Sequence, residues 1–298
     1  MIKKLLKAVL PVSVWNFLKS VKKTCRVIAV RLRLLLSLPL KKKLDRIEIG
    51  FHVAEHCNLN CAYCDNFSPL AEPEFIDVEE FRRDVERMAL LFKGECERIS
   101  LLGGEPLLHP RLSEIIDIAR TNFPECRRLR LLTNGILLTQ QKPSFWGQCH
   151  DRNVTLVITH YPINIDVAKI RELAEKFGVA LEYSSMTKDE FLKEPINLSG
   201  NGDYRKNFAL CSRGNKCIML GHGHLFTCTF VSNVHHFNRK FGTNIPVTEA
   251  DYIDIYKESD GEKILRRLAE PIPACRFCDM NFQSVEWRRS KQDISEWV

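Results

Sequence analysis

The sequence lacks an apolar run long enough to cross a membrane and lacks a secretory signal. In the N-terminal segment the longest uncharged run, Ala8 to Leu18, is far short of the ~20 residues that a membrane span needs. Lys7 interrupts the first apolar run, and no cleavage site of small residues follows it. Disulfide-like cysteine patterning is absent as well, although the chain has twelve cysteines. Several have cluster-like spacing, which suits a reducing compartment. We therefore predict a cytoplasmic protein.

Acidic residues are nearly missing from the start of the chain. Residues 1–46 contain thirteen lysines and arginines but one acid, Asp45. The rest of the chain has 31 basic and 36 acidic residues, a formal balance of −5. A nucleic-acid-binding fold would carry its basic surface on the folded domain, so we expect no nucleic-acid partner.

The basic N-terminal segment, residues 1–46, alternates apolar and basic clusters and includes aromatic residues. One interpretation is an amphipathic helical segment that binds an anionic membrane surface at the inner face of the membrane. The other is a helix that packs on the protein's own body or on a partner. Pro11 and Pro39 would break any long continuous helix there.

From residue 47 onward, strand-like and helical patterns alternate. Strands are expected at 47–53, 98–102, 129–133, 154–159 and 179–183. Between them, Asp77 should cap a first helix, Thr139 a third that continues to Trp146, and Asp166 a fourth that ends at Gly178. Such alternation implies parallel strands joined by crossover helices. The predicted fold is α/β, a partial (β/α) TIM-like barrel, because the polar stretch 197–207 offers no sixth strand.

Three cysteines, Cys57, Cys61 and Cys64, fall within eight residues. Thiolates select iron–sulfur clusters, zinc or copper(I). A structural zinc site takes four closed ligands, and no fourth cysteine follows until Cys96. Three thiolates on a four-iron cube would leave one iron open to a reactive ligand. A Cys₃His zinc set completed by His56 is the alternative.

Polar and glycine-rich motifs end the next strands. Gly103-Gly104-Glu105-Pro106 follows the second expected strand, as the cysteine loop follows the first. Reactive groups in such barrels lie at these C-terminal strand ends. Two adjacent glycines let a backbone approach a ligand closely. Asn134 follows the third strand, either as a ligand contact or as part of an Asn-Gly turn.

The CxxxCxxC spacing, with Tyr63 before its last cysteine and GGEP at the expected distance behind it, resembles the signature of the radical S-adenosylmethionine (SAM) enzymes. The resemblance implies a [4Fe–4S] cluster on the three cysteines, whose free iron chelates the amino and carboxylate groups of SAM. One electron then releases a 5′-deoxyadenosyl radical. A low-potential electron donor such as flavodoxin or ferredoxin is the implied partner. The implied SAM-binding residues are Tyr63, Gly103, Gly104, Glu105, Pro106 and Asn134.

The C-terminal third holds a second group of cysteines around a glycine-containing hairpin at 217–228. Hairpin followed by CxxC resembles the twitch domain, the shorter form of the SPASM auxiliary-cluster domain. This implies a second, auxiliary [4Fe–4S] cluster and leaves Cys217 without a ligand role, while a Cys₄ zinc site is the alternative. The expected domains are residues 1–46, 47–208 and 209–298, and a helix is expected over 251–268. The implied auxiliary ligands are Cys211, Cys228, Cys275 and Cys278.

A closed auxiliary cluster has no open iron, so its expected role is to accept an electron. That favours net oxidation of a small-molecule substrate, such as a carbinol on a sugar or cyclitol. His160 and Tyr161 end the fourth strand and are the candidate catalytic residues, because a hydroxyl beside a radical carbon must lose its proton. A peptide-modifying maturase is the alternative among enzymes. A non-catalytic metal-binding module docked to a membrane partner is the alternative from another class.

Overall fold

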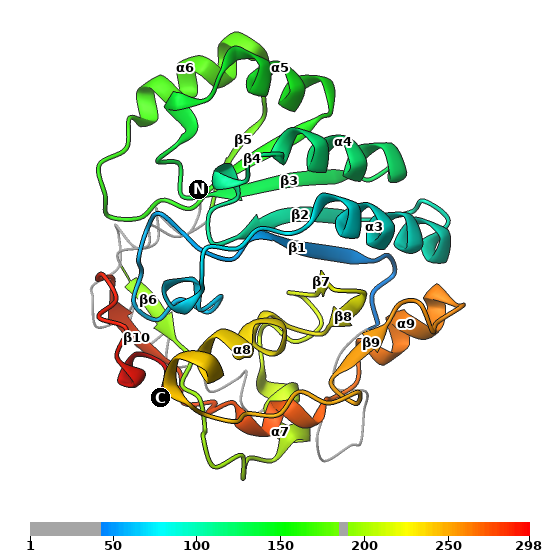
Figure 1. Ribbon diagram of the computed structural model, residues 1–298, viewed down its shortest axis with the longest axis vertical. Coiled ribbons are helices and arrows are strands. Elements are labelled where there is room, and N and C mark those ends of the chain that lie inside the picture. Colours follow the sequence, from blue (N-terminus) through cyan, green and yellow to red (C-terminus); the bar gives the residue numbers. More distant parts are fainter. Residues whose placement is uncertain (1–42, 185–189) are drawn as a thin grey trace, which may run out of the picture. The chain divides into compact units, whose positions relative to one another are not determined.

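The computed structural model describes residues 43–184 and 190–298, and Lys43 to Val298 cluster as one unit (Figure 1). The basic N-terminal segment, predicted to be an amphipathic helical segment that binds a membrane surface or packs on the body or a partner, lies outside the described residues except for its last four positions. None of the helices in these two ranges is both long and apolar enough to span a bilayer.

An eight-stranded sheet organises the described residues, in the order β5-β4-β3-β2-β1-β7-β8-β9. Its first five strands are parallel, as predicted, and the sheet stays open. Register partners such as Gly50, Ser100 and Arg130 align across β1, β2 and β3. The partial-barrel prediction is confirmed. The parallel strands are β1 (Glu48–Ala54), β2 (Arg98–Gly103), β3 (Arg128–Thr133), β4 (Val154–Ile158) and β5 (Leu181–Tyr183).

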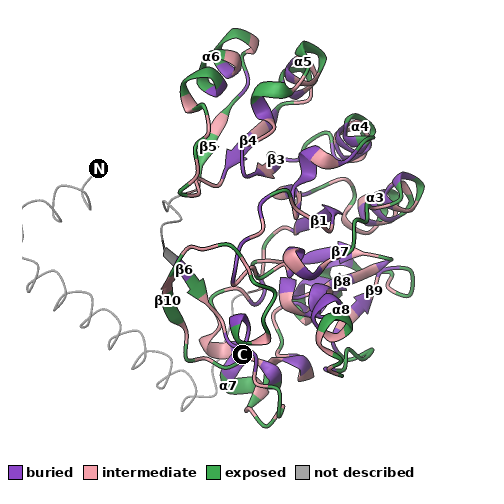
Figure 2. Cartoon of the chain, turned by 60° about the vertical axis from the view of Figure 1, so that its left-hand side comes forward, coloured by how far each residue is buried: buried purple, intermediate pink, exposed green. Residues whose placement is uncertain are grey.

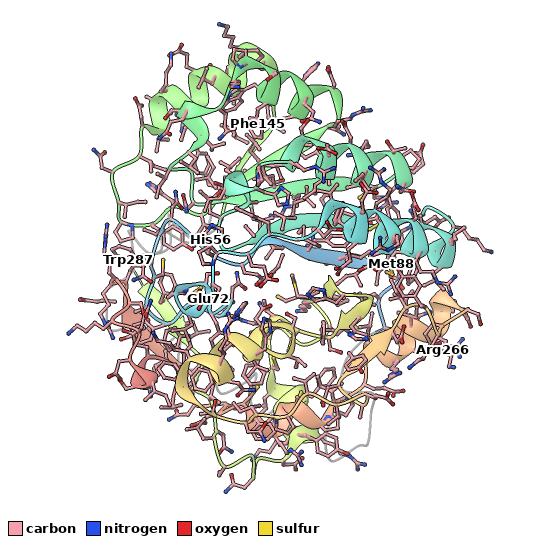
Figure 3. All side chains as sticks on the ribbon, viewed as in Figure 1. His56, Glu72, Met88, Phe145, Arg266 and Trp287 are labelled. Carbon is pink, nitrogen blue, oxygen red and sulfur yellow. The ribbon has the colours of Figure 1, made fainter. Side chains whose placement is uncertain are left out.

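Four crossover helices cover one face of the parallel strands (Figures 1 and 2). Alternate strand residues, among them Phe51 and Leu101, are fully buried against the helices. Phe81 and Met88 of α3 fill the same core, and Figure 3 labels Met88 there. The opposite strand face carries Glu48, Arg98 and other polar side chains, so it is free to form a polar site. The helices are α3 (Val78–Phe92), α4 (Leu112–Asn122), α5 (Pro143–Asp151) and α6 (Val167–Phe177).

The predicted helix ends are largely observed. Asp77 accepts hydrogen bonds from Glu79 N and Glu80 N, so it caps α3 as predicted. Gly178, at φ 66°, ends α6 in the left-handed conformation that glycine favours. The prediction at Thr139 is wrong, because α5 begins only at Pro143. Proline at the first helical position lacks only a donor that would be unpaired anyway.

The chain after the barrel adds an antiparallel extension to the same sheet. The expected hairpin forms β7 (Met219–Gly221) and β8 (His224–Phe226), and β7 also pairs with β1 through Gly50 and Met219. The helix expected over 251–268 is wrong in part, since β9 (Tyr252–Asp254) precedes α9 (Gly261–Arg267). The helix α8 (Thr229–Phe241) was missed, although Val234, Phe237 and Phe241 show its apolar spacing.

A second, two-stranded sheet pairs β6 (Glu190–Lys193) with β10 (Gln283–Glu286). The strand β6 therefore does not extend the parallel sheet. After β6 in the sequence comes the short helix α7 (Tyr204–Leu210), and Cys211 is its C-cap residue. Short 3₁₀ helices complete the described residues: η1 (Ser68–Leu70), η2 (Pro106–Leu108), η3 (Leu138–Gln140), η4 (Pro273–Phe277) and η5 (Ile294–Glu296).

Candidate active site

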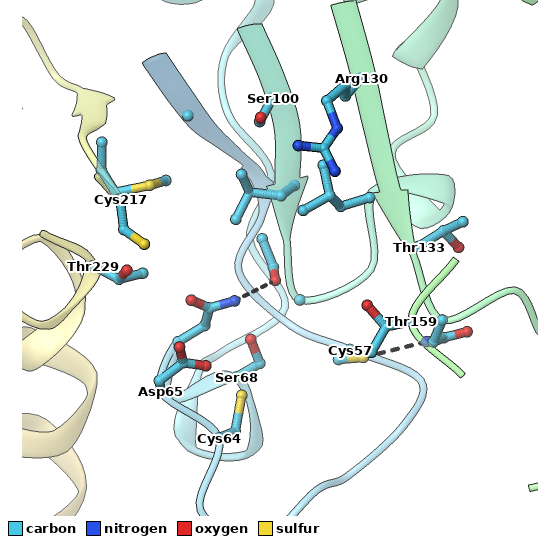
Figure 4. A pocket seen from close by; sticks show the side chains of 18 of the residues that line it. Cys57, Cys64, Asp65, Ser68, Ser100, Arg130, Thr133, Thr159, Cys217 and Thr229 are labelled. Atoms are coloured by element: carbon cyan, nitrogen blue, oxygen red, sulfur yellow. Dashed lines mark hydrogen bonds between the residues drawn. The ribbon is translucent and has the colours of Figure 1, made fainter. Parts of the chain in front are cut away.

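A cavity of about 360 Å³ lies on the polar face of the sheet, reaching the C-terminal ends of its strands. All three cysteines of the 57–64 loop line it (Figure 4). The neighbouring strand ends contribute Gly103, Gly104 and Asn134 to its wall. The cysteine loop and the Gly103-Gly104 motif therefore line the same cavity, because parallel strands bring their C-terminal ends to one edge of the sheet.

The cysteine loop is held by its own backbone and by the C-terminal tail. Leu59 N donates to Cys57 Sγ at 3.3 Å. The tail runs beside the loop, with Ala62 N bonded to Arg288 O at 2.9 Å. Trp287, labelled in Figure 3, donates its Nε1 hydrogen to Cys61 Sγ at 3.3 Å. Two N–H groups thus point at two of the three sulfurs, an arrangement that suits thiolates holding a cluster.

Burial disfavours bare thiolates in this loop. It raises the pKa of the Cys57 and Cys64 thiols to about 12. A cationic metal centre reverses such a shift, because it binds the deprotonated sulfur. The soft donor set, the N–H···S contacts and the adjoining cavity therefore fit an iron–sulfur cluster, which Cys57, Cys61 and Cys64 would hold.

The two glycines of the GGEP motif pack directly on the cysteine loop. A Cβ on Gly104 would lie 2.0 Å from His56 O, and a Cβ on Gly103 would lie 2.2 Å from Ala54 O. Gly103 also has φ +137°, a conformation that disfavours any side chain. Their backbones therefore fix the cysteine loop against the end of β2 and also line the cavity.

Glu105 connects the ends of β2 and β3. Its fully buried carboxylate accepts hydrogen bonds from Thr133 Oγ1 at 2.7 Å and Asn134 N at 2.9 Å. Burial outweighs these bonds and raises the pKa of Glu105 to about 7. Glu105 and Pro106, which begins η2, are not among the residues that line the described cavity. Asn134 does line this cavity, and its Nδ2 lies 3.6 Å from Cys57 Sγ.

The other predicted site residues differ in position. Tyr161 lines the cavity and stacks on Phe191, with ring centroids 5.9 Å apart. Burial, and then the thiols of Cys61 and Cys64, raise the pKa of Tyr161 well above its usual value. His160 is half-buried and does not line this cavity in the described structure. Tyr63 faces the tail instead, with the Arg288 guanidinium 5.1 Å from its ring centroid.

The second group of cysteines also gathers in one place. Cys211, Cys228 and Cys278 line a second, smaller cavity of about 70 Å³. Cys275 lies close enough to raise the pKa of the Cys228 and Cys278 thiols, after burial itself. Cys211 Sγ accepts hydrogen bonds from two following backbone N–H groups at 3.3 and 3.2 Å. No group of His, Cys, Asp or Glu in residues 43–184 and 190–298 is arranged around a single metal ion.

The two cavities adjoin each other. Asp65, next to Cys64, lines both, and so does Thr229. Asp65 pairs with Arg213, which also contacts Glu194 at 2.9 Å and lies two residues after Cys211. Cys217 lines the first cavity and not the second.

The sequence analysis did not identify Asp65, Arg213, Trp287 or Arg130 as site residues. Asp65 is adjacent to Cys64 and could have been found by that position. Arg130 could have been found as a charged residue at a cavity-facing position of a strand. Nothing in the sequence indicates that Trp287 contacts Cys61, because 226 positions separate them.

Comparisons with known proteins agree with this geometry. The model of the Radical SAM superfamily matches residues 51–168. The GTP 3′,8-cyclase of Stenotrophomonas maltophilia strain K279a is 36% identical over 95 residues, which are 31% of this chain and 28% of that protein. The antilisterial bacteriocin subtilosin biosynthesis protein AlbA of Bacillus subtilis strain 168 is 29% identical over 91 residues, 30% of this chain and 19% of that protein. The matches thus span less than a third of these relatives.

Two solved structures are similar in fold over more of the chain. A crystal structure of BtrN in complex with AdoMet and 2-DOIA gives a TM-score of 0.47 at 19% identity, covering 79% of this chain and 94% of that one. Native anSMEcpe with bound AdoMet gives 0.47 at 13% identity, covering 77% and 82%. The assignment rests on the matched domain, which contains both signature motifs. Residues 51–168 form a radical SAM domain.

Proposed function

We propose that this protein is a radical SAM oxidoreductase that oxidises a carbinol on a small sugar- or cyclitol-like substrate. The observation that carries the proposal is the meeting of the Cys57, Cys61 and Cys64 thiols with the Gly103-Gly104 backbone around one cavity. Bound there, a [4Fe–4S] cluster and SAM would supply a 5′-deoxyadenosyl radical that abstracts a hydrogen atom from the substrate. The chain's own residues must hold both molecules and exclude water.

The residues around this cavity divide these tasks. Gly103 and Gly104 keep the cysteine loop against β2 and leave room beside it for SAM. Asn134 Nδ2, at the end of β3, is directed to the same side as Cys57 and can donate to SAM. Tyr161 lines the cavity, which supports a contact between its side chain and the substrate hydroxyl. Tyr161 and the neighbouring His160 stay our candidates for moving the hydroxyl proton.

The second group of cysteines, next to the substrate cavity, favours a net oxidation of the substrate. Four ligands from Cys211, Cys228, Cys275 and Cys278 would leave no open position for substrate. We therefore assign this second site, in a twitch-like C-terminal domain, to electron acceptance. Because both cavities share Asp65 and Thr229, an electron would have only a short distance to travel from the substrate cavity.

The partners follow from the same chemistry. SAM cleavage needs a low-potential donor such as flavodoxin or ferredoxin, and we propose a cytoplasmic enzyme. The thirteen basic residues of 1–46 would add attraction to an anionic membrane surface that falls as salt rises.

The test replaces Cys57, Cys61 and Cys64 together by Ala and compares iron content and SAM cleavage after anaerobic reconstitution. We expect 5′-deoxyadenosine to vanish and iron to fall by about half, since either site would hold four irons. Cys149→Ala is the matched control, because Cys149 lies in α5 with its side chain buried in the core and lines neither cavity. It should keep both iron and cleavage.

The oxidation itself is tested with a carbinol deuterated at the reacting carbon. One 5′-deoxyadenosine carrying that deuterium should form per product, and the product should have two hydrogens fewer than the substrate. A redox-neutral isomer or a new carbon–sulfur bond would contradict the oxidation but leave the radical chemistry standing. Iron unchanged by the triple replacement, or zinc in place of iron, would contradict both.

A further inference from the structure

The wall of the main cavity also carries a basic group that SAM chemistry does not use. We propose that Arg130, supported by Arg98 and Lys216, forms an oxyanion subsite that selects a substrate bearing a phosphate or carboxylate group. The inference rests on the proposed function, whose substrate class it narrows.

The strand register places these side chains in the cavity. Ser100 of β2 and Arg130 of β3 are register partners, and both line the cavity (Figure 4). Side chains alternate along a strand, so Leu129 and Leu131 enter the helix-covered core while Arg130 faces the opposite way. Arg98, two residues before Ser100, lines the same cavity, and Lys216 joins it from the segment before β7.

Arg130 has hydrogen-bonding capacity to spare. Its Nε is buried with no hydrogen-bond partner in the described structure. Its Nη2 lies 3.6 Å from Glu182 Oε2, an ion pair with a side chain that is 55% exposed. Arg98, in contrast, pairs with Glu48 and donates to Lys216 O at 3.5 Å. A guanidinium with a free buried donor in a cavity suits a planar or tetrahedral oxyanion, which it can bind in two places at once.

The surroundings of Arg130 also favour an added negative charge. Burial and the neighbouring Arg98 and Arg128 lower the pKa of Arg130 below its ordinary value. These influences disfavour its positive charge, and a bound oxyanion would offset them. Among the described residues, the acids that act on the Arg130 charge are Glu182 and, more weakly, Glu48, which pairs with Arg98.

The position of Arg130 along β3 separates the proposed subsite from the C-terminal end of the strand. Arg130 precedes Thr133, the last residue of β3, by three positions, which is about 10 Å along a strand. SAM and the cluster would be held by the cysteine loop and Gly103-Gly104 at the C-terminal strand ends, so a subsite at Arg130 would serve a second molecule.

The test measures binding of inorganic phosphate, and separately of acetate, to the full-length reconstituted protein by calorimetry. Arg130→Gln should weaken binding of the preferred anion by about tenfold or more, the usual effect of losing a charge-assisted pair. Arg130→Lys should fall between, because it keeps the charge but loses the fork. Arg111→Gln is the control, since Arg111 is an exposed arginine paired with Glu114 at 2.6 Å, and it should bind like the wild type.

A preference for phosphate or for acetate would support the subsite and tell which group the substrate bears. Absence of binding of both ions would overturn it. Equal binding in Arg130→Gln and the wild type would also overturn it and indicate an adventitious ion only. If the circular-dichroism spectrum shows that Arg130→Gln does not fold, the anion affinity of Arg130→Lys is compared with that of the wild type instead. Equal affinity would then overturn the subsite. Failure of the proposed function would show separately, as absence of 5′-deoxyadenosine from the wild type.

Discussion

Replacing Gly104 by Ala gives a sharp test of how the cysteine loop is built. The new methyl carbon would lie 2.0 Å from His56 O and 2.9 Å from Cys57 N. Both atoms belong to the backbone, so no side-chain rotation can relieve the overlap, and the cysteine loop must move. Overpacking of this kind costs about 1–3 kcal/mol, and we expect the upper end, near 3 kcal/mol. The midpoint of thermal unfolding should then fall by roughly 6–12 °C, with less iron bound after reconstitution.

Gly147→Ala is the matched control for this prediction. Gly147 lies inside α5, and an added Cβ would have no neighbour within 4 Å. Ala favours a helix over Gly by about 0.8–1 kcal/mol, so this variant should unfold at a slightly higher temperature than the wild type. The same substitution of glycine by alanine should therefore lower the unfolding temperature at position 104 and raise it at position 147. If Gly104→Ala unfolded and bound iron like the wild type, the close packing of the two motifs would be refuted.

Three further predictions concern single contacts. Trp287→Phe removes the N–H donor 3.3 Å from Cys61 Sγ. This change should lower the reduction potential of the SAM-binding cluster by about 20–60 mV, measured by spectroelectrochemical titration. An unchanged potential would contradict the hydrogen bond from Trp287 to Cys61. Cys228→Ala should remove the auxiliary electron paramagnetic resonance signal while Cys217→Ala keeps it, because Cys217 lies outside the second cavity. Glu55→Gln should lower the free energy of unfolding at pH 7 by about 3 kcal/mol. Burial raises the pKa of Glu55, but the hydrogen bond with His236 Nε2 at 2.9 Å and the nearby His52 outweigh burial and hold that pKa below 4.5. This stability is therefore present above pH 4.5 and lost as pH falls below it, and equal urea midpoints of Glu55→Gln and the wild type at pH 7 would contradict the prediction.

Much of the architecture could be predicted because its causes are local. Apolar periodicity and the caps at Asp77 and Gly178 specify strands and helices through neighbouring residues. Strand–helix alternation then implies parallel strands, and parallel strands bring their C-terminal ends to one edge. That reasoning predicted that the cysteine loop, Gly103-Gly104 and Asn134 would surround one cavity. It failed at α5, where Pro143 set the start of the helix, and at α8, whose apolar residues Val234 and Phe237 are spaced for a helix that was not predicted.

What the sequence by itself determined is which chemistry the chain can support: the spacing of the thiolates indicates a site for soft metals, and glycines at strand ends show where a backbone can come close. Only the tertiary structure decided which distant groups surround those motifs. The contact of Trp287 with Cys61 joins residues 226 positions apart. Asp65 lines both cavities and pairs there with Arg213, 148 positions away in the sequence. The spare hydrogen-bonding capacity of Arg130 depends on how its strand neighbours pair. Such contacts arise from the packing of whole elements, so no spacing along the chain encodes them.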